Sequence, residues 1–559
     1  MASGNAAAAV VVAVVVAVVV AVAVVVAVVV AVVVAAAVVA AVVVAVAVVV
    51  AVAEPPGGGV SAIRRAVTSA WRHGTVVPAL SDYTRLECLS PAFDESWHGR
   101  RALREAAERL ASWSRSRPVP GLTAEVIELP GRTPVLLVEV EGEGEGDSDG
   151  RAVGGGGSAV GGGGSAVGAG GVLIYGHLDK QPPQGEWRAG LGPFTPVLDG
   201  DRLYGRGTAD DGYALFAAVT ALESLGGGHG PVRVLIEASE ESGSPDLGAY
   251  LDELAPRLGR PDLVLCLDSG CLSADRLWRT SSLRGLVGAT VGVEVLTEGV
   301  HSGAAGGVVP SSFRLLRQLL SRIEDERTGE VVVPECTAVV PEDHRRRLRE
   351  TATELGVSVL DELPGLDGVG AAVPDPGDQL VARAWAPALE VTGIDGAPPV
   401  ASAGNVLRPA TVAKLALRLP PSCDSTAAAA AVERHLRRDP PAGCRVTVRL
   451  DPPADGWVAP DPPGWLASVL DQASGACFGR PAGVLGEGGT IPFLALLARR
   501  FPEAAVVATG VLVPGSNAHG PNEFLHLPMA EAVTVAVALA VAGARLGPLP
   551  PGSTAGAPA

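Results

Sequence analysis

The sequence predicts an α/β fold in which a mainly parallel sheet is covered by helices on both faces, with a smaller α+β domain inserted into the chain. Up to about Arg284, apolar strand-like runs alternate with helical stretches, which is typical of a parallel sheet. From about Arg284 to Pro460, strands of alternating polarity and two helices suit a separate α+β domain. After Pro460, a helix, a strand and a terminal helix resume the first pattern.

The elements of the first part follow from their periodicity. Apolar residues that recur every three or four positions indicate helices, and short apolar runs bounded by turn residues indicate strands. We expect helices at "AIRRAVTSAWRHG", "WHGRRALREAAERLASWSRSR", "YALFAAVTALESL" and "LGAYLDELAPRL", and strands at "AEVIEL", "PVLLVEVEG", "GVLIYGHLD", "PVRVLIEASEE" and "DLVLCLDSG".

The later elements are read in the same way. In the inserted domain we expect strands at "GLVGATVGVEVL", "ALEVTGI" and "VAKLALRLP", and helices at "PSSFRLLRQLLSRIED" and "TAAAAAVERHLRR". The last part should contain the helix "GWLASVLDQASGACFG", the strand "AAVVATGVL" and the helix "MAEAVTVAVALAVAGARL". The predicted division of the chain is a low-complexity tail at 1–56, the main domain at 57–284 and 459–547, the inserted domain at 285–458, and a disordered C-terminal tail at 548–559.

Two low-complexity segments carry no motif. Residues 6–53 contain only alanine and valine, and such a run is roughly twice as long as the about 20 residues that cross a membrane. We interpret it as an artefactual or disordered extension, with a membrane anchor as the main alternative. Residues 141–171 form a Gly/Ser-rich loop between two strands, where added length costs little closure entropy.

Charge and cysteine content narrow the class of protein. The net charge of −17 and the lack of a dense basic block argue against a nucleic-acid partner. The short basic run "RRRLR" at 345–349 lies among acids and is expected on a solvated helix face. Seven scattered cysteines without a CxxC pair indicate neither a disulfide framework nor a zinc ribbon. A reducing compartment, the cytoplasm, is therefore predicted, with membrane anchoring through the Ala/Val run as the alternative.

Polar residues stand where the apolar strands end. In a parallel sheet, functional groups collect at the carboxyl ends of the strands, so these side chains are expected to lie together. Six carboxylates at one edge would repel one another without a cation, and metal is the simplest explanation. The residues are His177 and Asp179 in "GHLD", Asp210 and Asp211 in "RGTADDG", Glu240 and Glu241 in "EASEESGS", Asp268 in "CLDSG", and His519 in "NAHGPNE".

The types of these residues favour a borderline divalent ion. Imidazoles with carboxylates suit zinc, with manganese or cobalt possible. A pair of ions needs a bridging carboxylate, and the set supplies one histidine and one terminal carboxylate for each ion with Asp210 between them. One glutamate of the Glu240–Glu241 pair then remains beside the ions as a general base.

The ordered series "GHLD", "RGTADDG", "EASEESGS", "CLDSG", "HSG", "GEGGTIP" and "NAHGPNE" resembles the M20 family of dinuclear zinc exopeptidases, in its carnosinase and cytosolic non-specific dipeptidase branch. The resemblance runs from about residue 60 to 545. It implies a zinc-exopeptidase-like main domain, with the inserted domain acting as a lid and a dimerisation domain. The series is specific as a whole, although each motif alone is weak.

The resemblance also implies roles for the residues of the metal centre. Asp210 would bridge two zinc ions, and its peptide bond to Asp211 would be cis. Glu240 would be the general base, and Asp179 would hold the His177 ring in its ligating tautomer. The implied terminal ligands are His177, Glu241, Asp268 and His519.

Further residues are implied on the lid side. His301 in "GVHSGAAGG" would stabilise the oxyanion, often in the site of the partner subunit, which implies a homodimer through the inserted domain. Arg418 in "AKLALRLPP" would bind the C-terminal carboxylate of the substrate, together with Thr490 and the backbone at Gly489 in "GEGGTIP". One departure is Thr392, which stands before Gly393 where the family has a histidine.

The predicted function is metal-dependent hydrolysis of dipeptides or very short peptides by a water that two metal ions activate, with Glu240 as general base. One alternative is a deacylase of N-acyl amino acids with the same fold and ligands. Another is a non-catalytic binding protein, which an intact base argues against. At single positions, Glu240 could be an ion-paired carboxylate, His301 an exposed loop residue and Arg418 a structural arginine.

Overall fold

The structure is a computed structural model that describes residues 59–142, 170–356, 358–363 and 365–545. The Ala/Val tail, most of the Gly/Ser loop and the C-terminal tail lie outside the described residues, so the predictions for them remain predictions. Every helix and strand described below belongs to the compact unit Val60–Ala559.

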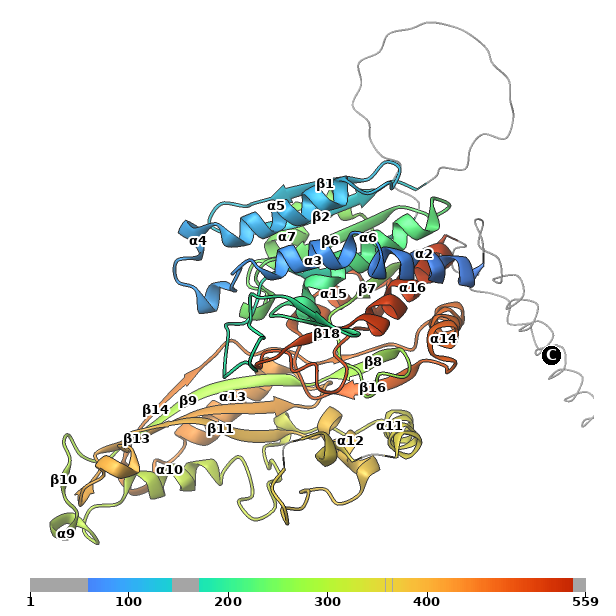
Figure 1. Ribbon diagram of the computed structural model, residues 1–559. Coiled ribbons are helices and arrows are strands. Elements are labelled where there is room, and N and C mark those ends of the chain that lie inside the picture. The colour runs from blue at the N-terminus through green and yellow to red at the C-terminus, as the bar shows by residue number, and fades with distance from the viewer. Residues whose placement is uncertain (1–58, 143–169, 357, 364, 546–559) are drawn as a thin grey trace, which may run out of the picture. The chain divides into compact units, whose positions relative to one another are not determined.

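A nine-stranded mixed sheet, counted over the described residues, forms the main domain (Figure 1). Its four central strands, β6, β3, β7 and β17, run parallel, and antiparallel pairs lie toward both edges. The predicted α/β fold with a mainly parallel centre is confirmed. The strands in spatial order are β1 (Thr123–Ile127), β2 (Val135–Val140), β6 (Val232–Glu237), β3 (Val172–His177), β7 (Leu263–Cys266), β17 (Ala505–Ala508), β8 (Trp278–Leu283) and β15 (Trp457–Val458), with β16 (Gly483–Glu487) also paired to β8.

Helices cover both faces of this sheet. The alternate side chains of the central strands point into two separate apolar clusters, so each face is buried against helices. One face is covered by α2 (Val60–Arg72), α3 (Val76–Thr84), α5 (Ala102–Arg115), α6 (Tyr213–Leu225), α14 (Gly464–Phe478) and α16 (Leu527–Ala544); the other is covered by α7 (Leu247–Glu253), α8 (Ala255–Leu258) and α15 (Pro492–Arg500).

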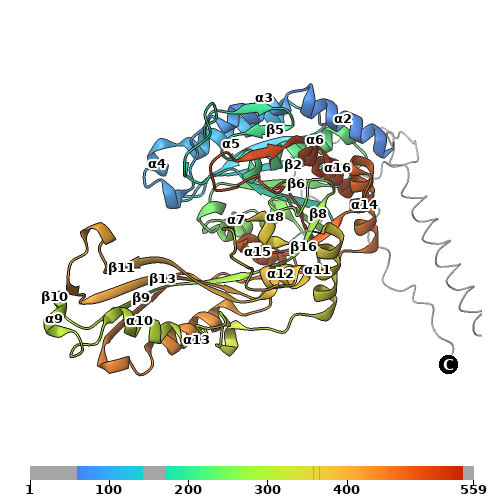
Figure 2. The same ribbon diagram turned by 60° about the horizontal axis from the view of Figure 1, so that its bottom comes forward.

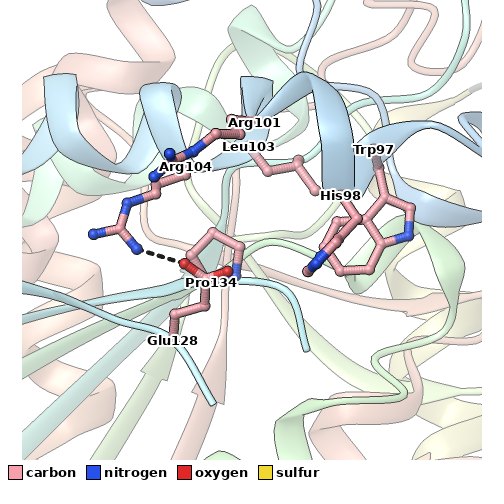
Figure 3. A pocket seen from close by; sticks show the side chains of 7 residues that line it. All are labelled: Trp97, His98, Arg101, Leu103, Arg104, Glu128 and Pro134. Carbon is pink, nitrogen blue, oxygen red and sulfur yellow. Dashed lines mark hydrogen bonds and ion pairs between the residues drawn. The ribbon is translucent and has the colours of Figure 1, made fainter. Parts of the chain in front are cut away.

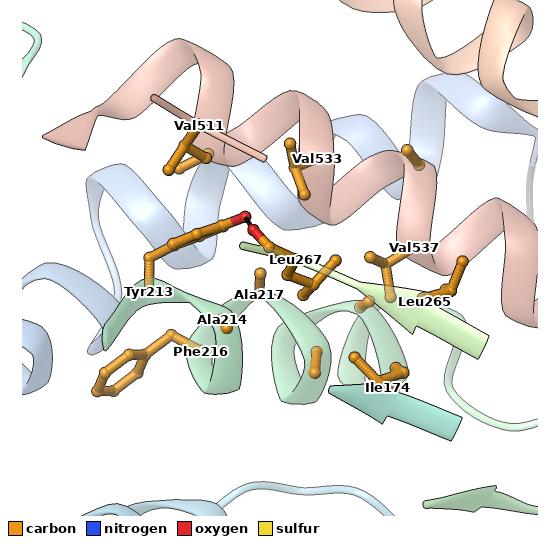
Figure 4. Packing of buried hydrophobic residues seen from close by; sticks show 14 of the residues in the cluster. Ile174, Tyr213, Ala214, Phe216, Ala217, Leu265, Leu267, Val511, Val533 and Val537 are labelled. Carbon is orange, nitrogen blue, oxygen red and sulfur yellow. Dashed lines mark hydrogen bonds between the residues drawn. The ribbon is translucent and has the colours of Figure 1, made fainter. Parts of the chain in front are cut away.

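Helix α16 lies in the core of the larger cluster (Figure 4). Val533 and Val537 of α16 face α6, and the Tyr213 hydroxyl of α6 donates a hydrogen bond to the Leu267 carbonyl beyond β7. Among the described helices, α16 alone is long and apolar enough to cross a membrane, and its residues are 72% buried inside the protein. Burial between α2, α6 and α14 accounts for its apolar sequence.

The inserted domain is built on a four-stranded antiparallel sheet (Figure 2). Along β13, every second side chain is buried against two helices, while the others stay half-buried on the opposite face. This confirms the predicted α+β insertion. The spatial order is β11 (Ala388–Asp395), β13 (Ala410–Leu419), β9 (Gly285–Glu294) and β14 (Arg445–Leu450), with α10 (Ser312–Leu320) and α13 (Ser425–Arg437) on the buried face.

Two helices within the range 285–458 pack on the main sheet instead. Leu348 and Ala352 of α11 (Glu342–Leu355), and Ala384 and Trp385 of α12 (Pro376–Trp385), belong to the larger apolar cluster beside β16. The chain therefore returns to the main domain between α10 and β11. The basic run at 345–349 lies on α11, where its arginines pair with acids.

The structure differs from the prediction at one further helix and adds one small sheet. The expected helix at 97–117 is interrupted at Arg101, whose φ of 58° lies in the left-handed region, and divides into α4 (Trp97–Arg100) and α5. A small sheet of three short strands, which the sequence did not predict, joins β18 (Phe524–His526), β5 (Arg202–Tyr204) and β4 (Val197–Asp199). It places the loop before Asp210 next to the loop after His519.

Candidate metal centre and active site

The predicted metal-binding side chains come from neighbouring strand ends. His177 ends β3, Glu240 and Glu241 follow β6 in the short helix η3 (Glu240–Ser242), and Asp268 follows β7. Because β6, β3 and β7 are adjacent and parallel, their carboxyl ends meet at one edge of the sheet.

Two further groups reach this edge from loops. Asp210 lies in the helical turn η2 (Thr208–Gly212), which follows β5, and the peptide bond between Asp210 and Asp211 is cis, as the resemblance implied. His519 has a φ of 64°, a left-handed conformation that side chains other than glycine rarely adopt. Its loop leads into β18, which pairs with β5.

The five candidate ligands form two groups that share Asp210. In the first group, His177 Nε2 lies 3.1 Å from Asp210 Oδ1 and 3.8 Å from Asp268 Oδ2. In the second, His519 Nε2 lies 3.0 Å from Asp210 Oδ2 and 3.3 Å from Glu241 Oε2. Within each group the donor atoms lie within 4.8 Å of one another, a spacing that suits a shared metal ion.

The charge of these groups is consistent with divalent cations. Burial, reinforced by Asp210, raises the pKa of Asp268 to about 7 and that of Glu241 to about 8. Burial also raises the pKa of Glu240 well above its usual value. The ion pairs found among the described residues give these acids only histidine partners. Imidazole nitrogens and carboxylate oxygens around an uncompensated buried charge fit a zinc-type ion.

The pKa values of the two histidines are also raised, although burial alone would lower them. Burial lowers the pKa of His177, but its contacts with Asp179 and Asp210 outweigh burial and leave the pKa well above its usual value. Burial likewise lowers the pKa of His519, while Asp210 raises it to a final value of about 9. Asp210 itself has a lowered pKa, because the two rings outweigh its burial.

Asp179 connects the His177 ring with the glutamate pair. Its carbonyl oxygen lies 3.1 Å from His177 Nδ1, while its fully buried carboxylate is 3.5 Å from the same atom. The carboxylate accepts the backbone N–H groups of Glu240 at 3.1 Å and Glu241 at 3.0 Å. An Nδ1–H donated to the carbonyl leaves Nε2 free to face the metal groups.

Glu240 lies beside the two groups and belongs to neither. Its Oε2 is 3.9 Å from His177 Nε2, and its side chain is 12% exposed. Gln181 donates a hydrogen bond of 2.7 Å to Glu241 Oε2. Glu240 therefore lies at the rim of the two ligand groups, whereas the Glu241 carboxylate faces His519.

A buried ion pair beneath the site was missed in the sequence. Arg206 donates to Glu523 Oε2 at 2.6 Å, and both side chains are almost completely buried. Glu523 Oε1 accepts the N–H groups of Gly207, Ala209 and Asp210 at 3.0 to 3.3 Å. Both residues stand in quoted motifs, "RGTADDG" and "NAHGPNE", so their adjacency to the ligands was the available signal.

The residues predicted on the lid side do not lie together: Arg418, Thr490 and Gly489 lie at one place and His301 at another. Arg418 on β13 donates a hydrogen bond of 2.8 Å from Nη1 to Thr490 Oγ1, and Gly489 beside it faces open space. His301 is exposed at the start of α9 (Ser302–Ala305), where Nδ1 accepts the N–H of Gly303 at 3.1 Å. Both views place β10 (Val300–His301) and α9 at the end of the inserted domain away from β8 (Figures 1 and 2).

A separate pocket of about 240 Å³ lies beside α4 (Figure 3). Trp97, His98 and Arg101 line it together with Arg104, which forms an ion pair with Glu128. None of the candidate ligands lines this pocket.

Comparison with known proteins agrees with the fold and identifies the family. The model of the peptidase family M20/M25/M40 matches residues 173–542. A cysteinylglycine-S-conjugate dipeptidase of Corynebacterium striatum is 29% identical over 374 residues, covering 65% of this chain and 79% of the relative. The human Beta-Ala-His dipeptidase is 28% identical over 372 residues, covering 63% and 70%.

Solved structures show the same architecture. The dipeptidase Dug1p of Saccharomyces cerevisiae superimposes with a TM-score of 0.65 at 21% identity, over 87% of this chain and 98% of that chain. Human carnosine dipeptidase 1 gives a TM-score of 0.66 at 20% identity, over 88% and 100%. At this identity the likeness shows the fold. Because the family model spans well over half of the chain, the protein belongs to peptidase family M20/M25/M40.

Proposed function

We propose that the protein is a dipeptidase that uses two divalent metal ions, with zinc as the preferred metal. The observation that carries this proposal is the pair of ligand groups that share Asp210, with Glu240 beside them in neither group. Membership of the peptidase family and the dipeptidase activity named for its relatives support the same reaction class.

His177, Asp210 and Asp268 would hold one ion, and Asp210, Glu241 and His519 would hold the other. When bound, such ions lower the pKa of a water molecule toward neutrality and polarise the carbonyl of the scissile bond. Asp179 fixes the His177 ring and the two glutamate backbones, and the Arg206–Glu523 pair fixes the Asp210 backbone. The chain therefore orients its ligands in advance.

Glu240 is the proposed general base. It takes a proton from the attacking water and passes it to the leaving amine, so that one carboxylate serves both halves of the reaction. Its position within 3.9 Å of the His177 ring nitrogen keeps it next to the reacting atoms.

Arg418 is proposed to bind the C-terminal carboxylate of the substrate. Its guanidinium is partly buried and already meets Thr490, and the backbone at Gly489 faces open space beside them. A planar guanidinium matches a carboxylate with two parallel hydrogen bonds. A subsite for the terminal carboxylate favours a short peptide with a free C-terminus as the substrate.

His301 is proposed to act in the site of a second subunit, within a homodimer formed through the inserted domain. Its side chain is exposed, and no contact with the ligand groups is found among the described residues. Val406, which pairs with His301 across β10 and β12 (Val406–Leu407), is exposed, as are Val308 at 83% and Val400 at 94%. Exposed apolar groups around a functional histidine favour a covered interface. A cytoplasmic location is also proposed, which the seven free cysteines support.

The test uses the whole chain, stripped of metal and reloaded with zinc or manganese. A mixture of dipeptides, tripeptides and N-acyl amino acids is followed by mass spectrometry. Metal-dependent loss of dipeptides alone is the expected result. Loss of the acyl compounds instead would move the enzyme to a deacylase. If nothing is consumed while two metal ions are bound, the proposed substrate class or the proposed catalysis is wrong.

A further inference from the structure

Arg284 lies where the chain passes from the main domain into the inserted domain. It follows β8 directly and precedes β9, the first strand of the inserted domain. Its Nε donates to the Gly488 carbonyl at 3.1 Å, and its Nη1 donates to the Ala386 carbonyl at 3.1 Å. Ala386 leads from α12 into β11, so one guanidinium ties two connections between the domains to the loop after β16.

The loop of residues 487–490 is fixed at both ends. Glu487 Oε1 accepts hydrogen bonds from Ser269 Oγ at 2.7 Å and from Thr280 Oγ1 at 2.6 Å, next to the candidate ligand Asp268. At the other end, Thr490 accepts from Arg418. The hydrogen bond from Arg284 to Gly488 lies between these two anchors.

The packing around the two glycines of the loop differs. A Cβ atom on Gly488 would lie 2.9 Å from Arg284 Nη2 and 3.1 Å from the Arg383 carbonyl oxygen, whereas a Cβ on Gly489 would meet nothing within 4 Å. Arg284 therefore packs against Gly488, whereas Gly489 faces open space and is followed by Thr490, the residue that Arg418 contacts.

The positive charges of Arg284 and Arg418 both lie beside this loop. Burial, with smaller contributions from Arg418 and Arg383, lowers the pKa of Arg284 to about 10. Among the described residues, the hydrogen bonds of Arg284 go to carbonyl oxygens and that of Arg418 to a hydroxyl, and neither guanidinium forms an ion pair. An anion bound by Arg418 is therefore attracted by two partly buried cations.

We infer that Arg284 is a positioning residue for the C-terminal carboxylate of the substrate, because it holds the Gly488–Thr490 loop against Arg418 and adds a second positive charge to that subsite. The inference rests on the proposed function, in which Arg418 binds this carboxylate. It predicts that the Arg284 side chain controls substrate binding more than turnover, and only for substrates with a free carboxylate.

The experiment compares Arg284→Met, Arg284→Lys and Arg418→Met in the metal-loaded full-length enzyme. Steady-state kinetics are measured with a dipeptide and with its C-terminal amide. Arg284→Met is expected to raise KM for the dipeptide about 10-fold or more with kcat within about threefold, which is the signature of lost ground-state binding. The amide should be unaffected. Arg284→Lys should recover part of the loss, because lysine keeps the charge but lacks the fixed fork that reaches two carbonyls.

Arg279→Met is the matched control, since Arg279 is a buried arginine on β8, five positions before Arg284. It should leave the ratio of dipeptide to amide kcat/KM unchanged. If Arg284→Met does not fold, as judged by circular dichroism, Arg284→Lys alone must still change that ratio.

The outcomes separate the inference from the proposal beneath it. If Arg418→Met lowers the ratio and neither Arg284 variant does, Arg284 is not a positioning residue while the proposed function stands. If Arg418→Met also leaves the ratio unchanged, the proposed carboxylate site is wrong. Equal losses for dipeptide and amide in the Arg284 variants would reduce the role of Arg284 to fold stability and overturn the inference.

Discussion

The edge of the main sheet and the tip of the inserted domain both carry residues of the proposed active site, and they are built in opposite ways. At the sheet edge, His177, Asp179 and Asp210 are buried, and each is fixed by hydrogen bonds to other buried groups. At the tip, the His301 side chain is exposed, and the one hydrogen bond found for its ring among the described residues comes from Gly303 in its own turn. The first region is held together by its own contacts, whereas the second, in the proposed function, completes a site only when a second subunit is brought to it.

The largest effect is expected at the sheet edge. Glu240→Gln should lower kcat about 1,000-fold, because the general base is lost while the ligands remain. Metal content measured by atomic emission should stay at the wild-type level. Glu253→Gln, an exposed glutamate on α7, is the control and should be fully active. Turnover retained by Glu240→Gln would place the base elsewhere.

His301→Ala tests the tip, with an expected loss of about 100-fold in kcat from one missing donor to the oxyanion. Mixing this variant with Glu240→Gln under conditions that exchange subunits should restore activity, because half of the hybrid dimer's sites receive both intact groups. Activity that stays at the sum of the separate variants would show that His301 does not act across subunits, and the contrast between the two regions would need another explanation.

A smaller effect is expected for Glu523→Gln, which keeps the shape of the side chain but removes the charge under the Asp210 loop. Loss of such a supporting partner lowers metal affinity about 10- to 100-fold. Competition with a chelator, read by metal-sensitive fluorescence, measures this directly. Glu531→Gln, in the ion pair with Arg72 on α2, is a control that should bind metal normally. Unchanged affinity in Glu523→Gln would mean that the sheet edge does not depend on this buried pair.

The smallest effect concerns the return connection from the inserted domain. The Asp455 carboxylate accepts from the Ser425 backbone and hydroxyl and from Arg499, and these contacts lower its pKa although burial opposes them. Asp455→Asn should cost about 1 kcal/mol of unfolding free energy near neutral pH.

The pH dependence of that loss has a definite sign. Because the folded-state pKa is depressed, the stabilisation is complete above the unfolded value of about 3.9 and disappears as pH falls through the folded value. Denaturant titrations of Asp455→Asn and the wild type should therefore converge in acid. A constant difference at all pH values would show that the contacts do not depend on the carboxylate charge.

The sequence predicted those parts of the molecule whose signals are local. Strands such as β3 and β6 are long apolar runs, and the ligands stand directly at their ends, so the shared edge followed from the parallel arrangement. The Arg206–Glu523 pair could not be predicted in this way, because the two residues are 317 positions apart and meet only through the pairing of β5 and β18, each three residues long. Helix α11 is mostly charged, and its buried stripe is only one residue wide and includes a histidine: His344, Leu348 and Ala352. Its packing on the main sheet is set by tertiary contacts.

The order of the strands also decides when the protein can fold during synthesis. Strand β17 lies between β7 and β8, and α16 packs on α6 and α2, yet both elements follow the inserted domain in the chain. A nascent chain that ends near Leu283 therefore exposes one edge of β7 and the apolar faces of two helices. The core of the inserted domain, in contrast, is contained within residues 287–448. The domain in the middle of the chain can be completed first, and the main domain waits for residues 457–544. Until they are made, the unpaired edge of its sheet is exposed to aggregation.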